Sequence, residues 1–213
     1  MVIKIFIWGM LLAPLAVVLE LFFIWLLNPT VNPLTLLSPN PEINFLKLIF
    51  IASLIPAFTE EYLKYQIVKS KALKSPEFDE PIDAMLYCII TALGFAAVEN
   101  LLILFRSPLM PFSQALTTIS FRFLGATFVH ALASGFLGYW LALGLTKTKQ
   151  RKKLIFFGLA LAISFHALYN YLVVIAETNK IAILLIIFLL IIMALIVSYS
   201  FKKLKNLTGV CKI

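Results

Sequence analysis

The sequence predicts an all-α fold, a polytopic membrane bundle of about six transmembrane helices that forms a single integral membrane domain over residues 1–213. Of the 213 residues, 62% are hydrophobic and 13% are charged, whereas soluble domains average about 45–50% apolar and 25% charged residues. Apolar stretches of twenty or more residues recur along the chain, and each is long enough to cross a hydrocarbon core of ~30 Å. We therefore expect a multi-pass protein of the cell membrane, surrounded by the lipid bilayer.

Six apolar stretches are long enough to span the membrane. They cover residues 5–27, 43–68, 82–105, 115–145, 154–176 and 181–201. Four prolines within residues 28–41 predict a non-helical loop after the first span. Pro56 predicts a kink in the second span. Glu20, near the end of the first span, is interpreted as an interfacial carboxylate. The sixth span has no charged residue, which predicts packing against lipid.

The distribution of basic residues predicts the orientation of the chain. The formal net charge is +8, and most lysines and arginines lie near the amino terminus, in residues 69–81, in residues 146–153 and in the tail after residue 201. The alternate loops hold only Arg106 and Lys180. Positively charged loops stay in the cytoplasm, so both termini are predicted to be cytoplasmic. Basic residues in short loops beside spans also argue against nucleic acid as a partner.

Ionisable and polar residues inside the spans predict a functional site. An ionised side chain at the membrane centre costs roughly 2.5–3.5 kcal/mol on insertion scales, so such residues are retained mostly for function. Four spans contribute them: Glu60, Glu61 and Lys64 in the second, Glu99 and Asn100 in the third, Arg122, His130 and Ser134 in the fourth, and His166 and Asn170 in the fifth. Counted from the predicted cytoplasmic edges at ~1.5 Å per residue, they reach comparable depths, so we expect them to meet near mid-membrane.

The residue types predict metal-dependent hydrolysis. Imidazole and carboxylate groups are ordinary zinc ligands, and a catalytic zinc keeps three protein ligands and a water. His130, His166 and Glu99 are the predicted ligands. The metal, expected to be zinc, would lower the pKa of its water and polarise a carbonyl. Glu60 is the predicted general base, which later protonates the leaving amine, and Glu61 would orient it or contact the substrate.

Other polar residues are predicted to complete the site. Asn170 lies one helical turn after His166 and would donate a hydrogen bond to the oxyanion. Lys64, four residues after Glu60, would balance the negative charge of a carboxylate that would otherwise be alone in surroundings of low dielectric constant. The remaining polar residues expected around the site are Arg122, Asn100 and Ser134.

The residues alone leave two alternatives open. A proton-coupled membrane transporter could use Glu60 and Glu99, and a structural or adaptor membrane protein could use none of these groups in chemistry. Many carriers contain internal repeats with paired broken helices. Only one candidate break, at Pro56, is evident, which makes a carrier the weaker alternative to a hydrolase.

Short motifs in a fixed order add a family resemblance. They are EExxK at 60–64, EPID at 80–83, GFAAxEN at 94–100, HxxxS at 130–134 and HxxxN at 166–170, with Arg122 between the third and fourth. This set resembles the PrsW family of intramembrane proteases, which is similar in turn to the superfamily of CAAX prenyl proteases and bacteriocin-processing proteins. The motifs lie within residues 55–172, in a protease-like core of about residues 43–176 flanked by the extra spans 5–27 and 181–201.

The resemblance implies a multi-helix fold that hydrolyses peptide bonds within or at the edge of the membrane. It implies that the paired glutamates and the histidines are essential. It also implies a membrane-bound protein substrate, such as an anti-sigma factor or another tethered peptide in bacteria.

Overall fold

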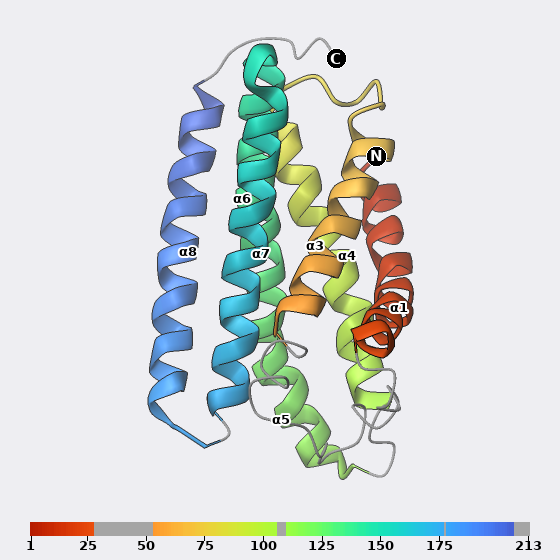
Figure 1. The fold of residues 1–213 in the computed structure, drawn as a ribbon, viewed down its shortest axis with the longest axis vertical. Helices are drawn as coiled ribbons and strands as arrows, with labels where there is room; N and C mark the ends of the chain where they lie inside the picture. The colour runs from red at the N-terminus through yellow and green to blue at the C-terminus, as the bar shows by residue number, and fades with distance from the viewer. Residues whose placement is uncertain (28–52, 106–109, 177, 207–213) are drawn as a thin grey trace.

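The regular elements of the described chain are all helices. The computed structural model describes residues 1–27, 53–105, 110–176 and 178–206 (Figure 1). The α-helices are α1 (Val2–Leu27), α3 (Ile55–Ile67), α4 (Pro81–Phe105), α5 (Phe112–Arg122), α6 (Phe128–Thr146), α7 (Arg151–Ala176) and α8 (Ile181–Lys205). The predicted all-α fold is therefore confirmed.

Five helices within the described residues are long and apolar enough to cross a membrane: α1, α4, the run Phe112–Thr146 that includes α5 and α6, α7 and α8. This confirms a multi-pass membrane protein. The first part of the predicted second span, residues 43–52, lies outside the described residues. Its described part is α3, which continues as a π-helical turn, Val68–Ala72, beyond the predicted end at residue 68. Pro56 lies in the first turn of α3, and this helix directly follows Ser53 and Leu54, which are π-helical.

Helix ends differ from the predicted spans where basic residues extend them. A short 3₁₀ turn, Thr148–Gln150, leads directly into α7, so this helix begins at Arg151 instead of residue 154. Helix α8 continues past residue 201 because Lys202, Lys203 and Lys205 lie in its last turn, where cations interact favourably with the helix dipole.

The long span of residues 115–145 contains an irregularity that its sequence does not indicate. A π-helical turn, Phe123–Thr127, separates α5 from α6. Such turns occur mostly as single insertions in α-helices and are frequent at functional sites. No residue of α5 is buried, and this helix extends beyond the foot of the bundle (Figure 1).

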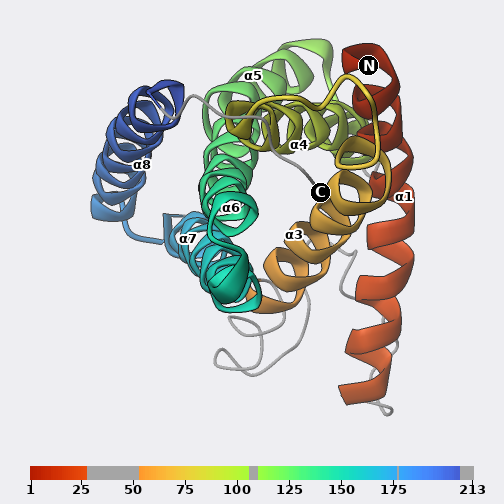
Figure 2. The same cartoon turned by 90° about the horizontal axis from the view of Figure 1, so that it is seen from above.

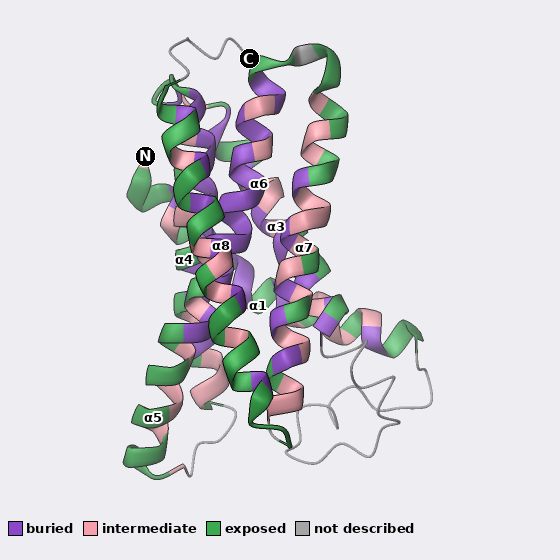
Figure 3. Ribbon diagram, turned by 90° about the vertical axis from the view of Figure 1, so that its left-hand side faces the viewer, coloured by how far each residue is buried: buried purple, intermediate pink, exposed green. Residues whose placement is uncertain are grey.

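Helix α6 occupies the centre of the bundle, where it contacts α4, α7 and α8 and also touches α3. Helices α1 and α8 lie at opposite edges (Figure 2), and burial is concentrated on the inner helices, with much of α8 exposed (Figure 3). Helices α1 and α4 approach closely at glycines. A Cβ atom on Gly94 would clash with the backbone carbonyl of Phe6, and one on Gly9 with that of Thr91. This contact fixes α4, which carries Glu99, against α1.

Candidate metal centre

The buried face of α3 carries the acidic pair into the bundle. Glu60 is 5% exposed, Glu61 is 0% exposed and Lys64 is 1% exposed. Residues three and four apart share a face of a helix, so all three lie on the face that includes Ala57 and Val68, both of which are fully buried. Helix α3 thus places two carboxylates and an ammonium between itself and the neighbouring helices.

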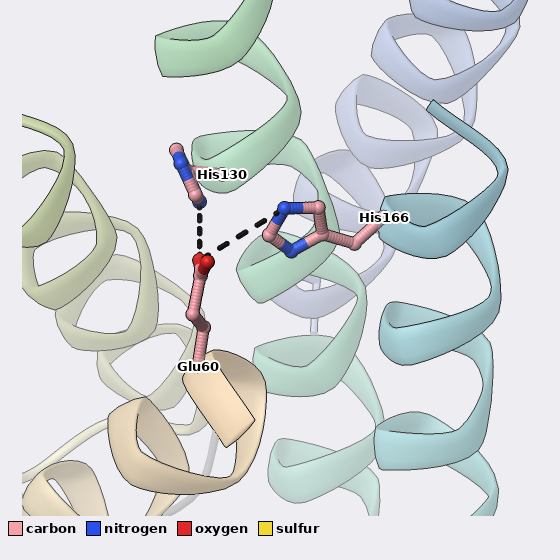
Figure 4. Close-up of side chains that lie close together, drawn as sticks. All are labelled: Glu60, His130 and His166. Carbon is pink, nitrogen blue, oxygen red and sulfur yellow. Dashed lines mark ion pairs between the residues drawn. The ribbon is translucent and has the colours of Figure 1, made fainter. Parts of the chain in front are cut away.

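Glu60 meets both histidines of the chain, which lie on α6 and α7 (Figure 4). Its Oε2 atom lies 3.5 Å from Nδ1 of His130 and 3.9 Å from Nε2 of His166. One ligand atom from each of the three residues lies within 4.8 Å of the other two. Both imidazoles are 2% exposed, and their rings meet edge to face with centroids 4.7 Å apart. The structure therefore brings together side chains that the sequence predicted to share one depth.

The other nitrogen of each imidazole contacts a carboxylate. Nε2 of His130 lies 2.8 Å from Oε2 of Glu99, and Nδ1 of His166 lies 3.0 Å from Oε1 of Glu61. An ionised carboxylate only accepts hydrogen bonds, so these ring nitrogens carry the protons. The lone pairs of the remaining nitrogens, the two that face Glu60, are then left to bind a cation. Metal-binding histidines almost always show this division between their two nitrogens.

Glu61 is held from three sides. Its Oε1 accepts from Nζ of Lys64 at 2.8 Å as well as from His166, and its Oε2 accepts from Oγ of Ser134 at 2.9 Å. The hydrogen bonds compensate a carboxylate that no water reaches. Lys64 also approaches Nδ1 of His130 at 2.8 Å and Oε2 of Glu60 at 3.5 Å.

Glu99 contacts Nε2 of His130, the ring nitrogen that does not face Glu60. It also belongs to a second network of polar contacts. Its Oε1 lies 2.8 Å from Nη2 of Arg122. Arg122 donates through Nε to Oδ1 of Asn100 at 2.8 Å, and Asn100 donates to Oγ1 of Thr127 at 3.0 Å. The sequence predicted Glu99 as the third metal ligand, but in the described residues the gathered donor atoms belong to Glu60, His130 and His166. Glu99 instead connects His130 to Arg122.

Asn170, the predicted oxyanion donor, lies one turn after His166 and is only half-buried. It takes part in none of the contacts above, so its role stays a prediction.

Sequence reasoning did not consider which face of α1 carries Glu20. The buried residues of α1 follow one stripe that includes Gly9, Ala13, Ala16 and Ile24, and Glu20 continues this stripe at a spacing of four residues. Glu20 itself is half-buried. Extending the apolar stripe of the first span through residue 20 would have shown that this carboxylate faces the neighbouring helices.

Comparison with known proteins places these residues in a family. The chain is 29% identical to protease PrsW of Oceanobacillus iheyensis over 136 residues, which cover 62% of this chain and 59% of the relative. It is 29% identical to protease PrsW of Geobacillus kaustophilus over 59% of this chain and 53% of the relative. For protease PrsW of Clostridioides difficile the identity is 25%, over 68% of this chain and 60% of the relative. The chain thus spans between half and two thirds of the length of these relatives.

No solved structure matches the chain. The family comparison is broader than the pairwise ones, since the match to the PrsW family runs over residues 1–198 and includes every residue of the candidate metal centre. Because this match covers nearly the whole chain, the protein belongs to the PrsW family of intramembrane metalloproteases.

Proposed function

We propose that the protein is an intramembrane metalloprotease that hydrolyses peptide bonds of membrane-associated proteins. Its family and the five candidate spans among the described residues support a protease that works within the bilayer. The observation that carries the proposal is the arrangement of the two imidazoles. Each uses one nitrogen on a carboxylate and turns the other toward Glu60.

The donor set fits a divalent metal of the zinc type, and we propose zinc. One carboxylate and two imidazoles form an ordinary set of three protein ligands for a catalytic zinc. Ligand atoms bound at about 2.0–2.2 Å to a tetrahedral ion lie about 3.3–3.6 Å from each other. The distances from Glu60 Oε2 to the two facing nitrogens are 3.5 Å and 3.9 Å, so small side-chain movements would complete the site. Glu60 takes the place that the sequence assigned to Glu99.

Glu60 is also the proposed general base. A divalent metal in this donor set would polarise the scissile carbonyl and make a water more acidic. Oε2 of Glu60 makes the contacts with His130 and His166, which leaves Oε1 to take the proton of the attacking water. The same carboxyl group would then protonate the leaving amine. Asn170 is proposed to donate a hydrogen bond to the oxyanion from the turn after His166.

The other polar residues act as positioning residues in this proposal. Glu61 orients His166 and holds Lys64, and Ser134 holds Glu61. Glu99 orients His130, while Arg122, which itself donates to Asn100, holds Glu99 in place. Partners of this kind fix the orientation of metal-binding imidazoles and raise their basicity.

The proposed substrate is a membrane-tethered protein such as an anti-sigma-factor-like regulator. The burial of the donor atoms supports a substrate that enters from the bilayer, because the site lies among membrane-spanning helices. Family membership favours this activity over a proton-coupled transporter that would use Glu60 and Glu99.

Purified protein in lipid nanodiscs tests the proposal. Bound metal is measured by mass spectrometry, and cleavage is measured on a panel of membrane-tethered peptides that includes anti-sigma-factor-type regulators. We expect one zinc per chain in the wild type, and loss of both zinc and cleavage in Glu60→Ala and His166→Ala. Glu77→Gln, which changes an exposed carboxylate, should keep both. A wild type that binds no divalent metal, or undiminished cleavage in the two site variants, would refute the proposal.

A further inference from the structure

Lys64 places a positive charge against the metal-binding atoms of the site. Its Nζ lies 2.8 Å from Nδ1 of His130, 2.8 Å from Oε1 of Glu61 and 3.5 Å from Oε2 of Glu60. The side chain is 1% exposed, so this ammonium is compensated by protein groups and not by water. Two of its three contacts are with proposed metal ligands.

An ammonium has three N–H donors and no acceptor, so Lys64 donates to the lone pair on Nδ1 of His130. The other nitrogen of this ring, Nε2, is already bound to Glu99. Nδ1 is therefore the atom that His130 would offer to a metal. A zinc ion bound at about 2.0–2.1 Å on the same lone pair would lie about 1 Å from the present position of Nζ. The ammonium and the metal cannot use Nδ1 together.

We propose that the Lys64 ammonium is the cation of the metal-free site, and that a divalent metal binds by displacing it from His130 and Glu60. This inference rests on the proposed metal-dependent function. Lys64 keeps its ion pair with Glu61 in the displaced position, because Glu61 lies outside the donor set. A lysine has a flexible four-carbon stem, and the Phe95 ring, with its centroid 4.4 Å from Nζ, stabilises a cation on that side.

This arrangement has two opposite effects. Glu60 and Glu61 are almost completely buried, and unpaired carboxylates in such surroundings are strongly unfavourable. The ammonium therefore stabilises the bundle before a metal arrives. It also lowers metal affinity, because every incoming ion must first break the contacts of Lys64. Lys64 is thus a positioning residue that sets how tightly the site binds metal.

Lys64→Met tests the exchange, since methionine fills much of the same space without charge. We expect calorimetric titration of the protein in nanodiscs to show zinc binding at least tenfold tighter than in the wild type. We also expect the metal-free variant to melt at a lower temperature than the metal-free wild type, and zinc to remove this difference. Lys71→Met is the matched control. Nζ of Lys71 also lies 4.4 Å from an aromatic centroid, that of Trp8, but Lys71 is exposed, and its loss should leave zinc affinity unchanged.

The possible results separate this inference from the function on which it rests. A wild type that binds no zinc overturns the proposed function. A wild type that binds zinc, together with equal or weaker binding in Lys64→Met, overturns only the exchange. If Lys64→Met folds only when zinc is present during purification, the exchange is supported. If the variant does not fold even then, wild-type protein with ¹⁵N-labelled lysine decides the matter: a lysine ammonium signal that shifts on zinc addition supports the exchange, and no shifted signal overturns it.

Discussion

Replacing Glu99 by glutamine distinguishes a carboxylate that binds metal from one that orients His130. Glu99 contacts Nε2 of His130 and Nη2 of Arg122, each at 2.8 Å. Glutamine keeps an oxygen that can accept from His130 but loses the negative charge that pairs with Arg122. Mutation of a carboxylate that orients a metal-binding histidine typically lowers metal affinity by about 10- to 100-fold, so we expect zinc affinity to fall within this range.

The assay is calorimetric zinc titration of Glu99→Gln beside His166→Ala and the wild type, with cleavage rates measured on the same preparations. His166→Ala removes a proposed ligand, so its zinc binding should be lost altogether. If Glu99→Gln loses zinc as completely as His166→Ala, Glu99 is itself a ligand and the roles derived from the geometry are wrong. If its affinity is unchanged, the contact with His130 has no influence on the site.

Three further predictions concern packing, the inner network and topology. Gly94→Ala should lower the free energy of unfolding by about 1–3 kcal/mol, measured by denaturation in detergent, because its methyl group would clash with a backbone carbonyl of α1. Ser134→Ala should cost about 1–3 kcal/mol in the same assay, because it removes a donor 2.9 Å from the buried Glu61. A membrane-impermeant maleimide should label Cys211 in inside-out vesicles and not in intact cells, since the tail is predicted to be cytoplasmic, whereas Cys88 is 1% exposed and should not react.

Each of these predictions has its own control. Gly135→Ala places its methyl group 3.3 Å from a side-chain atom of Val197 that can shift, so its effect should be much smaller; equal losses for Gly135 and Gly94 would contradict the packing argument. Thr91→Ala removes a hydroxyl that donates 2.7 Å to a carbonyl of its own helix, and a loss as large as that of Ser134→Ala would show that the Glu61 contact is not special. Labelling of Cys211 from outside intact cells would reverse the predicted orientation.

Composition and span length were sufficient to predict a helical membrane bundle, because the bilayer leaves few other ways to satisfy the backbone. Counting residues from the membrane edges also predicted that Glu60, His130 and His166 approach one another, which the structure confirms. Position along a span gives depth, and depth limits which side chains can meet.

Depth does not give the rotation of each helix about its axis, so the individual contacts within the site could not be predicted. Glu99 and Glu60 were both expected near the histidines. Which of the two carboxylates faces Nδ1 of His130 and Nε2 of His166 depends on the rotation of the helices and on the orientation of the imidazole rings. The interpretation of Glu20 as interfacial concerns depth and stays a prediction, since the face of α1 on which Glu20 lies does not test it. No residue in the run Phe123–Thr127 signals a π-helical turn, which depends on the packing around it.

That π-helical turn decides which changes of length this span can tolerate. A π-helical turn holds about one residue more than an α-helical turn, so a one-residue deletion within Phe123–Thr127 that made the helix regular would leave Arg122 and His130 in nearly the same angular relation. A deletion of Phe128 or Val129 that kept the π-helical turn would instead swing Arg122 by about 100° relative to His130, and Glu99, which now touches both, could then reach only one of them. One-residue deletions should consequently be tolerated within Phe123–Thr127 far better than at Phe128 or Val129.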